Sequence, residues 1–370
     1  MKIERIEAFQ VQWSPEEAPA RRSAFVRVWG DDGQYGIGEA SPMMGGLASL
    51  GIIKHNIAPD LIGADPLDHS VLQDRLMHGS LVKLGPEGAL TGALAAIDIA
   101  LWDLKGKMFG QPIYKLLGGA WKTSLPFYAS IGGNGAERSL DDVLRIVEER
   151  LKDQPAAIKI RFDNKRVTLD SDIPDHLKKA RAVRKLVGDD FPLAFDANNG
   201  YSTSGAMRVG RELEDLGYWW FEEPVQHYHI KATGDVANKL AITVSAGEQT
   251  YTTGGLVELI EAGVPMIQPD IVKMGGISGL QRCAAIAQAH GVELVSHQTQ
   301  PMIGHLANMH VCAAQLHATK PCEWNDPSTR THAIFDAPPV PKDGMFELSD
   351  RPGLGIEFIE AELKKRRVEI

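Results

Sequence analysis

The chain has 370 residues, of which 44% are hydrophobic and 24% charged, and its formal net charge is −9. This length exceeds the usual size of one domain, so we expect two domains with large cores. The negative charge argues against nucleic acid and anionic membranes as partners, because phosphate binding needs clustered Lys and Arg. Three cysteines without CxxC spacing indicate neither a disulfide framework nor a zinc finger. The first residues lack the apolar core of a signal peptide, which predicts a cytoplasmic protein.

The first third of the chain predicts an α+β domain over residues 1–122. Residues 2–13 and 23–30 alternate in the manner of strands, and Asp-Asp-Gly at 31–33 is a hairpin turn signal. Helical patterns follow at about 47–58, 66–78 and 86–108. Two irregular segments, SPEEAPARR and SPMMGGLAS, interrupt these elements. Strands followed by helices in this order are typical of an α+β domain.

A different rhythm begins near Leu125 and continues to about residue 330. LPFYAS and AAIKIRF predict two strands, each followed by a helical segment, and six further apolar runs end in a charged or protonatable residue every 22 to 27 residues. This spacing fits one strand, one loop and one helix, and consecutive βα units close most economically as a parallel barrel. We therefore predict a modified (β/α)7β barrel over 123–330. The turn-rich segment 331–370, with a strand expected at GIEFI, is predicted to return to the first domain.

The residues that end these six runs are expected to converge, because all strands of a parallel barrel present their carboxyl ends at one mouth. One acidic residue after a strand is usually only a helix N-cap, but six in phase are poorly explained by capping. Lys159 and Arg161 lie two apart on the second predicted strand and therefore share a face. The six residues are Asp196, Glu222, Glu248, Asp270, His297 and Glu323.

Three successive carboxylates at this mouth predict a magnesium site. Asp196, Glu222 and Glu248 would supply hard oxygen donors from adjacent strands and leave positions open for substrate and water. Without a cation these groups would repel one another strongly. Glu223 is the rival of Glu222, since alternation allows only one of the pair to face the mouth.

The next two strand ends predict an acid–base pair. Asp270 and His297 follow consecutive strands, and an aspartate behind an imidazole fixes its tautomer and raises its basicity. Glu323 could hydrogen-bond to a developing anion if it were protonated, and Lys159 and Arg161 add positive charge on the opposite side. This set indicates proton abstraction next to a carboxylate, with metal and fixed donors stabilising the enolate.

With these residues in place, the chain resembles the mandelate racemase subgroup of the enolase superfamily. AAIDIALWDLKGK and LLGG are similar to its capping-domain signature, FDANNGY, FEEP and GE to its three metal-ligand strands, and QPDIVKMGGISG with SHQ to its Asp–His dyad. The resemblance implies Asp196, Glu222 and Glu248 as Mg²⁺ ligands, Asp270 and His297 as the dyad, and Glu323 as electrophilic helper. It also implies that SPEEAPARR and SPMMGGLAS close over the substrate and that the protein is a homo-oligomer.

One departure from the family pattern bears on the reaction. The racemase pattern is Lys-x-Lys, whereas this chain has Lys159-x-Arg161, and a guanidinium is essentially always protonated. Dehydration can use one base, so we favour a sugar-acid dehydratase that yields a 2-keto-3-deoxy acid. The alternatives are a racemase or epimerase of a 2-hydroxy acid, a cycloisomerase that uses Lys273, and a pseudoenzyme. His227 and His229 have metal-pair spacing but are interpreted as a loop.

Overall fold

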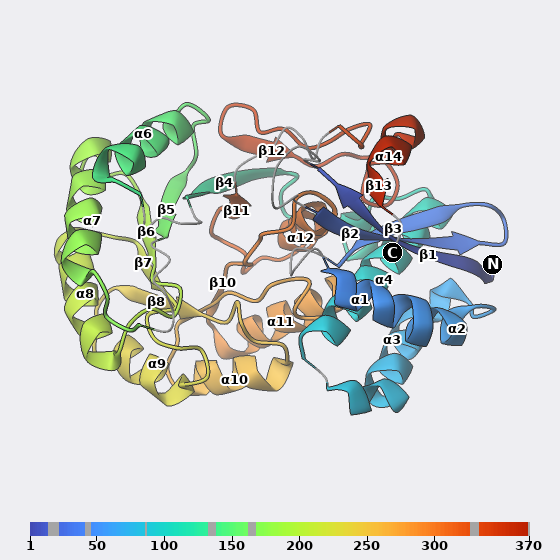
Figure 1. Cartoon of the computed structure of the whole chain (residues 1–370), viewed down its shortest axis with the longest axis horizontal. Coiled ribbons are helices and arrows are strands. Elements are labelled where there is room, and N and C mark those ends of the chain that lie inside the picture. Colours follow the sequence, from blue (N-terminus) through green and yellow to red (C-terminus); the bar gives the residue numbers. More distant parts are fainter. Residues whose placement is uncertain are drawn as a thin grey trace.

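The computed structural model describes residues 1–13, 22–40, 46–85, 87–131, 138–161, 168–325 and 333–368. They form two sheets (Figure 1): a four-stranded antiparallel sheet in the order β13-β1-β2-β3 and a nine-stranded sheet built around eight parallel strands. The predicted combination of an α+β capping part with a parallel barrel is confirmed. The boundaries at residues 122 and 330 stay a prediction.

The capping sheet is assembled from both ends of the chain. Its strands are β1 (Ile3–Gln12), β2 (Arg22–Gly30), β3 (Tyr35–Glu39) and β13 (Arg367–Val368), and β13 pairs antiparallel with β1. Helix α14 (Glu360–Arg366) leads directly into β13. The prediction that the tail returns to the first domain is therefore confirmed. The strand predicted at GIEFI is wrong: this segment makes one isolated bridge, between Phe358 and Phe335, and the pairing strand follows α14.

Helix α4 (Ala89–Phe109) is the central helix of the capping part and is buried on almost all sides. It packs directly on β3 because Gly36 and Gly38 carry no side chain there. A Cβ at either glycine would lie 1.9 Å from a carbonyl oxygen of α4, that of Ala100 or Ala96. The remaining helices of this part are α1 (Leu47–Ile52), a π-helical turn (Ile53–Ile57), α2 (Ala58–Leu61), a 3-10 turn (Pro66–Asp68), α3 (His69–His78), a second 3-10 turn (Ser80–Leu84) and α5 (Ile113–Leu116).

The eight parallel strands follow one another around the barrel, and a helix comes after each of the first seven among the described residues, as the (β/α)7β prediction requires. The strands are β4 (Ser124–Ile131), β5 (Ala157–Arg161), β6 (Leu193–Asp196), β7 (Trp220–Glu222), β8 (Thr243–Ala246), β9 (Met266–Ile267), β10 (Glu293–Leu294) and β11 (Cys322–Asn325). The helices are α6 (Leu140–Leu151), α7 (Ile173–Val187), α8 (Thr203–Asp215), α9 (Ile230–Ala237), α10 (Thr253–Glu261), α11 (Ile277–His290) and α12 (Ile303–Ala313).

Side chains bridge β10 and β11, the two ends of the hydrogen-bonded order of barrel strands. β11 pairs with β4 by backbone hydrogen bonds, and β12 (Met345–Glu347) adds an antiparallel strand to the start of β4. Between β10 and β11, the Gln298 N–H donates to Glu323 Oε2 over 2.8 Å, and the Asn325 amide donates to the Gln298 carbonyl. The interior below this mouth is filled by a small cluster of inward-facing side chains, namely Tyr128, Ala157, Ala194, Trp220, Met266 and Val295.

None of the described helices is long and apolar enough to cross a membrane.

His310 makes the junction of barrel, capping part and tail sensitive to acid. Its Nδ1 accepts from the Tyr114 N–H over 3.3 Å, and its Nε2 lies 3.4 Å from the Leu354 carbonyl oxygen, so the neutral ring satisfies both contacts. Burial lowers the pKa of His310 from 6.5 to about 4. Because the folded state then binds fewer protons at His310 than the unfolded state, the contribution of His310 to stability is constant above about pH 6.5 and is lost progressively as the pH falls to about 4.

We expect His310→Gln to remove most of this acid sensitivity, since a glutamine amide can accept from Tyr114 and donate to Leu354 without titrating. The difference between 6.5 and about 4, at about 1.4 kcal/mol per pH unit, corresponds to about 3 kcal/mol. Urea unfolding at pH 7 and pH 4.5 measures this difference in the free energy of unfolding. His290→Gln, at an exposed position, serves as the control and should leave the pH dependence unchanged. Equal pH dependence in all three proteins would contradict the prediction.

Candidate active site

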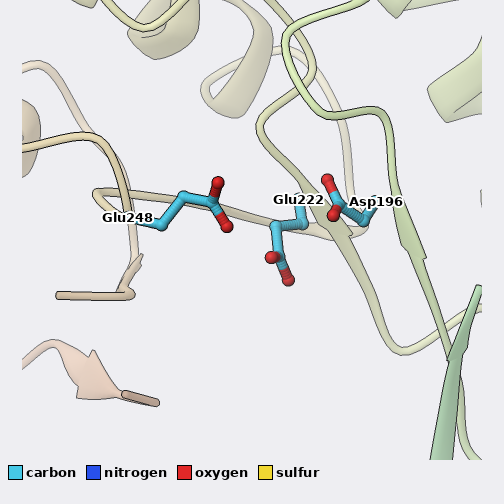
Figure 2. Close-up of side chains that lie close together, drawn as sticks. All are labelled: Asp196, Glu222 and Glu248. Carbon is cyan, nitrogen blue, oxygen red and sulfur yellow. The ribbon is translucent and has the colours of Figure 1, made fainter. Parts of the chain in front are cut away.

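Three buried carboxylates from neighbouring strands meet at the barrel mouth. Asp196 ends β6, Glu222 ends β7, and Glu248 follows β8 by two residues. One oxygen of each lies within 4.8 Å of the others. Figure 2 shows Glu248 and Asp196 reaching toward one another across the ribbon, with Glu222 between them. Asp196 and Glu222 point inward because each lies two residues after an inward-facing floor residue, Ala194 or Trp220.

Glu223 does not belong to this group. Its carboxylate accepts a hydrogen bond from the Asn199 side chain, and its backbone has a positive φ of 40°, which ends the strand. Burial, with the charges of Glu248 and Asp196, raises the pKa of Glu223 well above its usual value. Among the described residues, Asp196, Glu222 and Glu248 alone have the geometry of a metal cluster.

The cluster has the chemistry of a site for a hard divalent cation. Burial, and after it the charge of Glu222, raises the pKa of Asp196 to about 8, so the three carboxylates do not all ionise readily by themselves. Oxygen donors from three strands suit Mg²⁺, which keeps several open positions. These residues therefore fit the predicted magnesium ion.

Lys159 is a fixed positive charge on the floor of the mouth. Its Nζ lies 2.6 Å from Glu222 Oε1 and 3.0 Å from Glu323 Oε1, and the side chain is 1% exposed. Burial by itself lowers the pKa of Lys159, but Glu222 and Glu323 outweigh it and raise that pKa well above its usual value. Lys159 is therefore held in its charged form and is a poor proton acceptor.

Arg161 lies beside the metal cluster. Its Nε is 3.8 Å from Asp196 Oδ2, and its Nη2 donates to Asn198 Oδ1 over 3.3 Å. About a quarter of the side chain is exposed, in contrast to Lys159. Both predicted cations are thus at the mouth, where both remain protonated.

The predicted dyad is formed. His297 Nδ1 lies 2.8 Å from Asp270 Oδ2, while His297 Nε2 lies 3.0 Å from Glu248 Oε2. Burial by itself lowers the pKa of His297, but Glu248 and the hydrogen bond to Asp270 outweigh it and raise that pKa to about 9. A cation bound to Glu248 would reduce this attraction, and the imidazole would then lose its proton more easily.

Glu323 is present at the mouth, where its surroundings favour the ionised form. Burial favours its neutral form, yet Lys159 and His297 outweigh burial and lower the pKa of Glu323. A carboxylate that accepts from Lys159 and from the Gln298 N–H is ionised and cannot donate a hydrogen bond. A donor role for Glu323 would require a proton that reaches it during the reaction.

Several supporting residues escaped prediction because they carry no charge. Gln268 Nε2 donates to Glu222 Oε2 over 2.8 Å, and Trp220 Nε1 donates to the same oxygen over 3.1 Å. Gln300 Nε2 lies 3.2 and 3.1 Å from the two oxygens of Asp270. Gln268 stands two residues before Asp270, so strand alternation was a signal for it. Gln300 lies beyond its strand and gave no such signal.

The remaining described residues that the sequence singled out do not join the metal cluster or the dyad. The rings of His227 and His229 pack against Tyr228 at 5.2 and 4.5 Å, and neither joins a metal cluster among the described residues. Of the segment SPEEAPARR only Arg22 is described, and it donates to Gln10 Oε1 and Gln12 Oε1, each over 3.4 Å. The first part of SPMMGGLAS also lies outside the described residues.

Comparisons with known proteins agree with this geometry. Residues 8–118 match the mandelate racemase / muconate lactonizing enzyme N-terminal domain, and 142–362 match the enolase C-terminal domain-like family. The chain is 32% identical to D-galactarolactone cycloisomerase of Agrobacterium fabrum, covering 91% of this chain and 89% of that protein. It is 30% identical to arabinonate dehydratase of Saccharolobus solfataricus, covering 88% and 85%.

One solved structure that is similar to this chain contains bound magnesium. A mandelate racemase/muconate lactonizing protein from Paracoccus denitrificans PD1222, complexed with magnesium, is 60% identical and superposes with a TM-score of 0.95 over 100% of this chain and 99% of that one. Both halves of the chain match their respective family, and the relatives cover nearly its full length. The chain therefore belongs to the mandelate racemase/muconate lactonizing enzyme family of the enolase superfamily.

Proposed function

We propose that this protein is a Mg²⁺-dependent dehydratase of a sugar acid, an aldonate or aldarate, which it converts to a 2-keto-3-deoxy acid. One observation carries the proposal. The mouth offers one imidazole backed by a carboxylate, His297 with Asp270 at 2.8 Å, while the opposite side offers Lys159 and Arg161, both held protonated. A site with a base on one side suits elimination better than racemisation, which needs a base on each face.

The residues divide the work as follows. His297 removes the α-proton, and Asp270 holds the imidazole in the tautomer that presents Nε2 to the substrate and stabilises the imidazolium that forms. The same imidazolium then donates its proton to the departing β-hydroxyl, which leaves as water. Arg161 and Lys159 supply positive charge for the enolate. Asp196, Glu222 and Glu248 would hold Mg²⁺, which when bound stabilises negative charge on the substrate carboxylate.

The relatives support this class of substrate. Besides arabinonate dehydratase, an L-talarate/galactarate dehydratase of Salmonella typhimurium is 31% identical over 89% of this chain. Family resemblance also supports a homo-oligomeric assembly. Analytical ultracentrifugation checks the assembly.

A cycloisomerase is the second candidate, because the Agrobacterium relative carries that name and Lys273 stands at the mouth. The Lys273 Nζ donates to Gln249 Oε1 over 3.1 Å, and Gln249 Nε2 donates to Glu248 Oε1 over 2.7 Å. Lys273 is thus linked through one amide to the metal cluster. The intact dyad of His297 and Asp270 favours the dehydratase. A racemase or epimerase would need Lys159 or Arg161 as its second base.

A panel of C4 to C6 aldonic and aldaric acids, incubated with the protein and Mg²⁺, tests the proposal. Semicarbazide absorbance detects any 2-keto acid that forms. Formation from one stereochemical group of acids supports dehydration. A lactone consumed or formed without a 2-keto product would favour the cycloisomerase.

We expect Arg161→Lys to lower the dehydration rate about tenfold, since one charge-assisted hydrogen bond donor of fixed geometry is lost. The variant also restores the Lys-x-Lys pattern, so we expect α-proton exchange on the opposite face of the substrate. Proton NMR in D₂O on the same acid measures both effects. Arg161→Met, which carries no base, is the matched control and should show no second exchange. An unchanged dehydration rate in both variants would contradict the assigned role of Arg161.

A further inference from the structure

The loop between β9 and α11 holds the carboxylate of the dyad by its own backbone. Asp270 Oδ1 accepts from the N–H groups of Val272, over 2.8 Å, and Lys273, over 3.1 Å. The Met274 N–H donates to the Asp270 carbonyl over 2.9 Å. The orientation of Asp270, and through it of His297, therefore depends on the path of residues 271–276.

Three side chains of the capping part fix the far end of this loop. Gln73 Nε2, on α3, donates to the Gly275 carbonyl over 2.8 Å. On α4, Asp98 Oδ2 accepts from the Ser278 N–H over 3.0 Å, and Trp102 Nε1 donates to Ser278 Oγ over 2.9 Å. The side chains of Gln73, Asp98 and Trp102 are all at least nine-tenths buried. Figure 1 shows α11 next to the helices of the capping part.

Asp98 stands where α11 would otherwise have no capping side chain. Helix α11 begins at Ile277, and Gly276 occupies its N-cap with a φ of 90° and no side-chain acceptor. A carboxylate at the start of a helix accepts from a free backbone N–H, and its negative charge interacts favourably with the helix dipole. The fit is close, because a Cβ on Gly276 would lie 2.4 Å from Asp98 Oδ2.

Asp98 is itself held in place. Its second oxygen lies 2.7 Å from His69 Nε2, and the His69 ring meets the Trp102 ring edge-on at 5.2 Å between centroids. The carboxylate thus has a partner on each oxygen, one within the capping part and one on the barrel loop.

We propose that Asp98 of the capping part is a positioning residue for the catalytic dyad. It fixes the end of the 271–276 loop through Ser278 of α11, the loop backbone fixes the Asp270 carboxylate, and Asp270 fixes His297. The capping part therefore acts on the chemistry itself, through the position of the dyad. This inference rests on the proposed function for its catalytic consequence, while its structural step, from Asp98 to the loop, stands on the contacts alone.

Asp103 provides a matched control on the same helix. It is also a fully buried carboxylate that accepts from backbone groups, namely Ile37 N–H over 2.9 Å and Leu354 N–H over 2.7 Å, and it pairs with Lys107 at 3.0 Å. Its partners lie in the capping sheet and the tail. Loss of Asp103 should therefore lower thermal stability without touching the dyad.

The experiment compares Asp98→Ala, Asp98→Asn and Asp103→Ala with the unaltered protein. Hydrogen–deuterium exchange is measured in peptides that cover 271–278, and kcat and KM are measured with Mg²⁺ on the acid that the panel identifies. We expect Asp98→Ala to speed exchange in 271–278 and to lower kcat about 30-fold with KM nearly unchanged, since small misplacement of a catalytic group costs about 10²-fold or less. Asp98→Asn keeps one oxygen for Ser278 and should recover most of kcat.

The outcomes separate the inference from the proposed function. Wild-type exchange in 271–278 for Asp98→Ala, or an equal loss of kcat in Asp103→Ala, overturns the inference. Faster exchange with unchanged kcat overturns its catalytic step. If the unaltered protein turns over no acid, the proposed function fails, while the exchange data still decide the structural step. Should Asp98→Ala fail to fold, Gln73→Leu, which loses the hydrogen bond to Gly275, takes its place. This variant must then show faster exchange in 271–278 and a lower kcat, each by a smaller factor.

Discussion

His297→Asn is expected to abolish catalysis while leaving the fold intact. The imidazole is the one group at the described mouth that combines a hydrogen-bonded carboxylate at 2.8 Å with a second nitrogen directed at the metal cluster. An asparagine amide can neither remove an α-proton nor return it to a leaving hydroxyl. Since general acid–base catalysis contributes about 10²- to 10⁴-fold, and this residue serves in both steps, we expect kcat to fall by about 10⁴-fold.

The measurement is the rate of 2-keto acid formation, together with α-proton exchange by proton NMR in D₂O. Both rates should fall together, because α-proton exchange reports the proton abstraction that must precede elimination. His290→Asn, an exposed substitution on α11, controls for preparation and should be unchanged. Retained exchange in His297→Asn, with elimination lost, would mean that another group removes the α-proton. Lys159 would then have to be reconsidered despite its two carboxylate partners.

Removal of the divalent cation is the second large effect. EDTA should eliminate turnover, and Mg²⁺ should restore it. Mg²⁺ should also raise the melting temperature, because a ligand at about 100 times its Kd stabilises the folded state by about 2.7 kcal/mol. Asp196→Asn should lose both responses. Its metal-free form should be at least as stable as the metal-free parent protein, because a neutral amide replaces a buried carboxyl group whose pKa is raised to about 8. Differential scanning calorimetry with and without Mg²⁺ measures these melting temperatures.

The pH dependence of metal binding follows from the pKa of Asp196, which is about 8 in the metal-free site. A ligand must be deprotonated to bind Mg²⁺, so the apparent affinity should rise with pH up to about 8 and level off above it. Binding at pH 7 should release about one proton, which titration calorimetry in buffers of different ionisation enthalpy measures. An affinity independent of pH between 6 and 8 would contradict this assignment, as would Mg²⁺ stabilisation that survives in Asp196→Asn.

The sequence was sufficient to predict the barrel and the charged residues of its mouth. Each of Asp196, Glu222, Asp270, His297 and Glu323 lies at or just after a strand, so the period of the βα units already placed them together. Strand alternation likewise predicted that only one of Glu222 and Glu223 would face the mouth. These predictions succeeded because they depend on local patterns that repeat along the chain.

The missed features depend on contacts between distant parts of the chain. The sequence offers no sign of the role of Asp98, because its partner Ser278 lies 180 residues away. The tail was expected to pair through GIEFI, but the capping sheet accepts Arg367–Val368 after a helical turn. The charge state of Glu323 could not be predicted either, since it is set by contact with Lys159 from another strand. Residue type and spacing along the chain do not show which distant residues come into contact.

Dehydration is tested most directly by proton NMR of the protein with Mg²⁺ in D₂O and the panel of C4 to C6 sugar acids. We expect one stereochemical group of acids to lose its β-hydroxyl and to appear as a 2-keto-3-deoxy acid, and we expect His297→Asn to form none. Deuterium that enters an α-position without elimination, in the unaltered protein, would contradict dehydration and indicate a racemase or epimerase.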